Sequence, residues 1–134
     1  MGSEDVHREP VYVFVLDHTY VFKRYFDLND CFDALAEHYD HDEYRFEVPE
    51  REWDGVADVL RDYGFEPAVV EDVEPFVLVV EQYTRHAEVL KHSVEHWTRR
   101  GYEFFLMKDP LSVERAVQEH GATPVTETDL VVGL

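Results

Sequence analysis

The sequence contains one cysteine, only three lysines, and no apolar run that approaches the about 20 residues of a membrane-spanning helix. The single Cys31 excludes an intramolecular disulfide and is typical of a reducing compartment. Residues 1–10 are polar and acidic, unlike a signal peptide. We therefore expect a cytoplasmic protein without membrane contacts.

Basic residues are scarce, with 12 Lys and Arg against 30 Asp and Glu, so that the formal net charge is −18. The densest basic spots, Lys23-Arg24 and Arg99-Arg100, are too small to neutralise a phosphate backbone, which argues against nucleic acid as a partner. Hydrophobic residues make up 45%, a globular value. An acidic, lysine-poor surface over a normal core indicates adaptation to high salt, where self-repulsion is screened. An ordinary acidic protein is the alternative.

The familiar catalytic motifs are also missing: the chain has no glycine-rich phosphate loop, no Walker motif and no G-x-S-x-G. Cys31 lies close to Asp30 and Asp33, whose charges disfavour a reactive thiolate. We therefore expect a non-catalytic module that uses no cofactor. It would bind a small molecule or a protein partner, with a homodimer as one assembly open to it.

Two segments of the chain resemble each other. Residues 36–39 (Ala-Glu-His-Tyr) recur 58 positions later as residues 94–97 (Val-Glu-His-Trp). The pattern Gly-x-x-Pro at residues 64–67 recurs 57 positions later, at residues 121–124. The repeat predicts one domain over residues 1–134, made of two similar halves, residues 11–73 and 76–132, related by a pseudo-twofold axis. Residues 1–10 are expected to be a flexible tail.

Hydrophobic periodicity predicts an α/β fold in which each half runs β-α-β-α-β and the two halves share a mixed sheet. The expected strands are residues 11–16, 44–48, 67–73, 76–80, 102–107 and 129–132, and the expected helices are residues 28–39, 49–63, 85–100 and 110–120. Residues 17–27 have no counterpart in the second half. They are expected to form either a hairpin or a loop over a site.

The histidines His92 and His96 belong to an H-x-x-E-H pattern, which binds zinc when it lies on a helix. On the predicted helix 85–100, His92 and Glu95 lie opposite the apolar stripe, so a solvated helix face is the favoured interpretation. His38 and His96 occupy matching places in the repeat. They could face each other across the pseudo-twofold axis, or simply border the core on either side.

Residues 79–124 resemble the second half of a GNAT-type N-acetyltransferase. The segment Gln82-Tyr83-Thr84-Arg85-His86-Ala87 matches that family's Q/R-x-x-G-x-G/A loop at Gln82 and Ala87, while Arg85 replaces the central glycine. The resemblance implies acetyl-CoA as cofactor, with Gln82 and Arg85 as the candidate binding residues. The family's tyrosine position is Val117 here. A divergent acyltransferase is therefore the alternative function.

Overall fold

The computed structural model describes residues 8–26, 29–81 and 86–134 and divides the chain into two compact units, Met1–Val69 (unit 1) and Val70–Leu134 (unit 2). The candidate cofactor-binding residues Gln82 and Arg85 lie outside the described residues.

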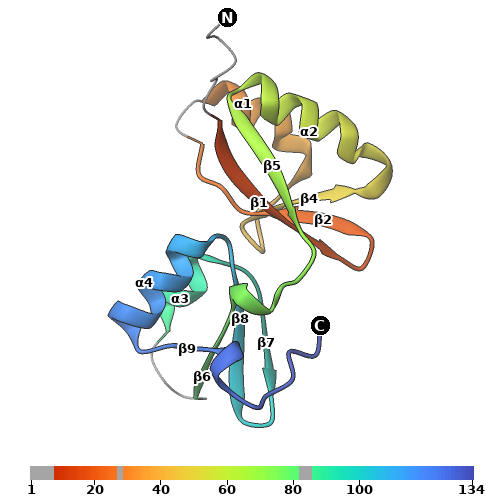
Figure 1. The fold of residues 1–134 in the computed structure, drawn as a ribbon. Helices are drawn as coiled ribbons and strands as arrows, with labels where there is room; N and C mark the ends of the chain where they lie inside the picture. The colour runs from red at the N-terminus through yellow and green to blue at the C-terminus, as the bar shows by residue number, and fades with distance from the viewer. Residues whose placement is uncertain (1–7, 27–28, 82–85) are drawn as a thin grey trace, which may run out of the picture. The chain divides into compact units, whose positions relative to one another are not determined.

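Unit 1 is a mixed sheet with two helices on one face (Figure 1). Its elements are β1 (Glu9–Leu16), β2 (Thr19–Phe22), α1 (Asn29–Leu35), the 3₁₀ turn η2 (Ala36–His38), β3 (Tyr39–Asp40), β4 (Arg45–Pro49), the 3₁₀ turn η3 (Glu50–Glu52), α2 (Trp53–Asp62) and β5 (Phe65–Val70). The strand order is β3-β4-β2-β1-β5, and β2 is antiparallel to both of its neighbours. The N–H of Glu9 donates to the carbonyl of Gly64 over 3.2 Å, so that β1 and β5 start side by side. β1 begins at Glu9, inside the segment expected to be a tail.

The core of unit 1 lies between the sheet and its helices. It is made by alternate residues of the strands and one stripe of each helix, including Val13, Phe22, Phe46, Val48, Leu35, Trp53, Val56 and Leu60. Phe22 stacks on Phe46 with ring centroids 4.9 Å apart, and Tyr20 stacks on Trp53 at 4.7 Å. Each such pair is worth about 0.5–1.5 kcal/mol beyond its buried area. The first stack joins β2 to β4, and the second fixes α2 against β2.

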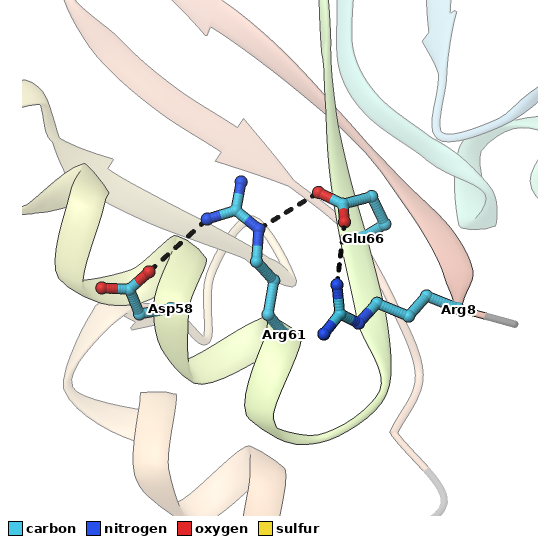
Figure 2. Close-up of polar contacts among 4 residues, drawn as sticks. All are labelled: Arg8, Asp58, Arg61 and Glu66. Carbon is cyan, nitrogen blue, oxygen red and sulfur yellow. Dashed lines mark hydrogen bonds and ion pairs between the residues drawn. The ribbon is translucent and has the colours of Figure 1, made fainter. Parts of the chain in front are cut away.

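A chain of ion pairs joins the end of α2 to the neighbouring strands (Figure 2). The Arg61 guanidinium contacts Glu66 of β5 at 3.1 Å and Asp58 at 3.5 Å, and Glu66 also accepts from Arg8 at 3.4 Å. All four side chains are at least 40% exposed, so each pair contributes only about 0–1 kcal/mol. The cluster positions α2, and its exposure limits what it adds to stability.

Unit 2 is an antiparallel sheet with two helices on one face (Figure 1). After the 3₁₀ turn η4 (Glu74–Phe76), its elements are β6 (Val77–Glu81), α3 (Ala87–Lys91), β7 (Ser93–Arg99), β8 (Tyr102–Met107), α4 (Pro110–His120), β9 (Thr123–Pro124) and the 3₁₀ turn η5 (Val125–Glu127). The strand order is β7-β8-β6-β9. The residues between this sheet and its helices are Leu78, Val80, Val89, Phe105, Met107, Ala116 and Ala122.

The predicted α/β class is confirmed, and several elements have the predicted bounds. β8 and α4 agree with the prediction residue by residue, and residues 17–27 contribute the second strand of the β1–β2 hairpin. Asp17 and His18 at its turn have positive φ values of 50° and 63°, as a two-residue type I′ turn requires. The prediction that the two halves share one sheet is wrong, because the strands belong to two separate sheets. The strand expected at residues 129–132 is not formed.

The largest error concerns residues 85–100, which were expected to form one helix. The helix α3 ends at Lys91, and residues 93–99 form strand β7, which pairs with β8 along its whole length. The spacing of Leu90, Val94 and Trp97 suits a helix, but β-branched and aromatic residues also suit a strand. Arg100 and Gly101, with φ values of 53° and 83°, make the tight turn that allows β7 to pair with β8.

Both units contain the element order β-α-β-β-α-β, with β2 as an additional strand in unit 1. In α2 and α4, residues that match in the repeat have the same packing role. Val56 belongs to the core of unit 1, and Val113 packs against the core of unit 2. The matching positions disagree in the strands. Phe46 packs against the helices of unit 1, and its match in the repeat is Phe104. In unit 2, however, it is the next residue, Phe105, that packs against the helices. A shift of one residue reverses the face of a strand. An internal duplication therefore stays a prediction.

Candidate functional site

A groove in unit 1 lies between two helical segments, α1 with η2 on one wall and η3 with α2 on the other. Its volume is about 340 Å³, within the range of small-molecule sites. Its apolar lining comes from Ala34, Leu35, Val56 and Val59. Leu35 and Val56 also belong to the core, so the floor of the groove is the outer surface of that core.

Gly55 lines this groove as the third residue of α2, in the first turn of the helix. A glycine inside a helix is less favourable than alanine by about 0.5–1 kcal/mol. Nothing in the fold requires it, because its φ is not positive and a Cβ added there would meet no atom within 4 Å. The missing side chain leaves open space at an exposed position in the lining of the groove.

His38 is the most deeply buried polar side chain of the lining, with 9% of its surface exposed. It lies in η2, between α1 and β3, where the chain turns from helix to strand. Its Nε2 is 3.6 Å from the Glu37 carboxylate, and Glu37 itself is 78% exposed. A largely buried imidazole therefore lines a groove that combines apolar and charged side chains, with a carboxylate beside it.

The rim of the groove is charged. Arg51 and Glu52 come from η3, and their side chains lie 3.9 Å apart from nitrogen to oxygen. Arg51 also lines a second, more open hollow of about 530 Å³ at the β1–β2 turn, together with Asp17, His18 and Glu50. His18 and Glu50 are 87% and 67% exposed, so this hollow is shallow and polar. The inserted hairpin thus lies next to the groove and does not cover it.

In the structure, the residues of the H-x-x-E-H pattern do not lie on one helix. His92 caps the end of α3, and Glu95 and His96 lie in β7, so the favoured solvated helix face is also wrong for them. An extended chain advances about 3.3 Å per residue, which separates His92 from His96 far more than two ligands of one zinc ion allow. Burial, followed by the nearby Lys108, lowers the pKa of His92. The described residues contain no cluster of three potential metal ligands.

His38 and His96 differ in their surroundings despite their matching places in the repeat. His38 is buried in a 3₁₀ turn, whereas His96 is an exposed residue of β7 whose ring lies 6.2 Å from that of Phe105. His38 lines the groove of unit 1. The sequence alone could not distinguish the surroundings of these two histidines, because the residues next to them are nearly the same.

A second histidine in unit 2, which the sequence did not single out, makes a close contact with a carboxylate. The Nε2 of His86 lies 2.6 Å from Glu103 of β8, and its ring packs against Phe105 at 5.1 Å. A carboxylate in this position can orient a general base. The other ring nitrogen, Nδ1, is buried and has no hydrogen-bond partner within the described ranges. It is therefore not presented to a substrate, and the pair joins the start of α3 to the sheet.

Cys31 is 1% exposed and packs in the core of unit 1. Burial raises the pKa of its thiol, which keeps it protonated and unreactive. The unreactive thiol agrees with the sequence prediction, although the cause is the apolar core and not the neighbouring aspartates.

The fold and the groove define an α/β protein of two small sheet-and-helix units, with a ligand-sized groove in the first. No family model, curated protein or solved structure matches the chain. Among the helices of the described residues, none is both long enough and apolar enough to cross a membrane.

Proposed function

We propose that the chain is a non-catalytic binding module whose groove in unit 1 takes a small, mainly apolar molecule. The observation that carries the proposal is Gly55. It lies in the first turn of α2, where alanine is the better helix former, has no conformational need to be glycine, and leaves open space in the lining of the groove.

The apolar lining and the buried His38 support the same function. A ligand site combines mainly apolar walls with a few placed polar groups, and a volume of about 340 Å³ suits a molecule with roughly ten to twenty heavy atoms. His38 would supply the polar contact at the wall. The groups that suggested chemistry lie elsewhere: Cys31 is buried in the core, and His86 makes its close contact with Glu103 in unit 2.

Salt adaptation and a cytoplasmic location belong to the same proposal. The net charge of −18 on 134 residues is the support for salt adaptation, since such a charge is tolerated best where salt screens it. The single buried Cys31 is the support for a reducing compartment.

The proposal is tested with 2-phenylethanol, a neutral molecule of suitable size, added to ¹⁵N-labelled protein. Binding in the groove shifts the amide signals of residues 34–38 and 51–59 in a saturable way and leaves those of unit 2 in place. Saturable shifts elsewhere, or no shift at the solubility limit of the probe, would reject the groove as the site.

The alternative is a divergent GNAT-like acyltransferase, which rests on the sequence match at Gln82 and Ala87. Acetyl-CoA is the discriminating ligand. If this alternative holds, millimolar acetyl-CoA raises the melting temperature, because a ligand that binds only the folded state stabilises it. An unchanged melting temperature would favour the binding module.

A further inference from the structure

The charged groups around the groove do not balance. Arg51 lies 3.9 Å from Glu52, so its charge has a partner within the rim itself. Glu37 has no Lys or Arg within ion-pair distance among the described residues, and its charged neighbour is His38, which is cationic only when protonated. One carboxylate of the rim is therefore left without a permanent cation.

That carboxylate lies where a ligand would meet it. Glu37 belongs to the lining of the groove, and its side chain is 78% exposed at the edge of the apolar walls. Walls of low dielectric concentrate the field of a charge at the mouth of a cleft. The chain as a whole carries a formal charge of −18, which adds to the field of Glu37 and opposes any anion.

We infer that the ligand of this groove is a small organic cation: an apolar body with one ammonium group, seated with the body on Leu35, Val56 and Val59 and the ammonium against Glu37. The inference rests on the proposed function, since it names the class of molecule that the same groove takes. The apolar residues of the groove would bind the apolar part of the ligand, and the carboxylate of Glu37 would favour a positive charge on it. An anionic ligand would bring a second negative charge to a rim that already has a surplus.

The experiment compares three probes that share one phenylalkyl body and differ in charge. They are 2-phenylethylammonium, 2-phenylethanol and 3-phenylpropanoate, each titrated into ¹⁵N-labelled protein at one fixed salt concentration. We expect the ammonium to bind about fivefold more tightly than the alcohol, the factor given by a unit charge pair about 4 Å apart in water. The carboxylate should bind most weakly of the three.

Two variants assign the preference to its residue. Glu37→Gln removes the unmatched charge and should reduce the advantage of the ammonium over the alcohol to less than twofold. Glu43→Gln removes the same charge from the β3–β4 turn of unit 1, outside the groove, and should keep the advantage. Both positions are exposed, so neither change disturbs the core.

The outcomes separate the inference from the function on which it rests. Equal binding of all three probes, or tighter binding of the carboxylate, would overturn the cationic ligand and leave the groove as a binding site. An advantage that survives in Glu37→Gln would overturn the role of Glu37. If none of the probes shifts residues 34–38 and 51–59, the proposed function itself is wrong.

Discussion

Asp109 accepts a hydrogen bond from the backbone N–H of Ser112, with 2.7 Å between Oδ1 and the amide nitrogen. This contact satisfies one of the free amides at the start of α4 and makes Asp109 the N-cap of the helix. Lys108 contacts the other carboxylate oxygen at 2.7 Å. The side chain of Asp109 is 24% exposed, so the helix start is largely shielded from water.

Replacing Asp109 by alanine removes this cap and should lower the free energy of unfolding by about 1 kcal/mol, within a usual range of about 0.5–2 kcal/mol. Asp109→Asn should cost less, because an asparagine oxygen can still accept from Ser112. Urea denaturation of the three proteins at pH 7 checks the order. An alanine variant as stable as the parent would show that the cap contributes nothing.

The same residue predicts a dependence of stability on pH. Burial acts to raise the pKa of Asp109, but the hydrogen bonds from Lys108 and Ser112 outweigh it, and the pKa is lowered in the folded state. The stabilisation by the carboxylate is therefore complete above the unfolded-state pKa of about 3.9 and is lost as the pH falls through the lower folded-state value. The difference in unfolding free energy between the parent and Asp109→Asn should shrink from pH 6 to pH 2. A constant difference would contradict the shift.

Cys31 should be protected from thiol reagents in the folded protein. Because it is buried and its pKa is raised, the thiolate is rare and inaccessible. We expect the reaction with 5,5′-dithiobis(2-nitrobenzoate) at pH 8 to be at least about tenfold slower in buffer than in 8 M urea, since it requires local opening. Equal rates in the two conditions would show that the core around α1 is open.

Salt should stabilise the chain strongly. With a net charge of −18, repulsion between surface carboxylates opposes the compact state, and this repulsion is screened within about 3 Å at 1 M salt. We expect the melting temperature to rise steadily from 0.1 M to 2 M KCl. Sucrose serves as the control for general stabilisation, because it favours burial without screening charge. A melting temperature that does not change with KCl would remove the case for salt adaptation.

The sequence predicted those parts of the fold that are determined locally. Residues 110–120 carry all the signals of a helix: Asp109 as cap, Pro110 in the first turn and Gly121 as the left-handed end. β7 could not be assigned in this way, because Leu90, Val94 and Trp97 fit a helix as well as a strand. What decides its structure is pairing with β8, a contact between two segments. Periodicity within one segment does not contain that information.

The candidate site shows the same limit. The sequence drew attention to His38 through the repeat and to residues 17–27 through their absence from it. His38 lines the groove, and Asp17, His18 and Thr19 line the hollow beside it. Gly55 could not be recognised from the sequence, because a single glycine in a predicted helix indicates only a weak helix former. Its significance depends on the open space beside it, which only the folded structure shows. His92 and His96 were set apart by a motif whose helix does not form.

The measurement that tests the central claim most directly uses three variants of α2 and the neutral probe 2-phenylethanol. Gly55→Ala should raise the free energy of unfolding by about 0.5–1 kcal/mol, because alanine is the better helix former and has room. Gly55→Leu should fill the groove and weaken probe binding at least tenfold. Asp54→Leu, one position away and outside the lining, should leave binding unchanged. A folded Gly55→Leu variant that binds the probe as tightly as the parent would contradict the account.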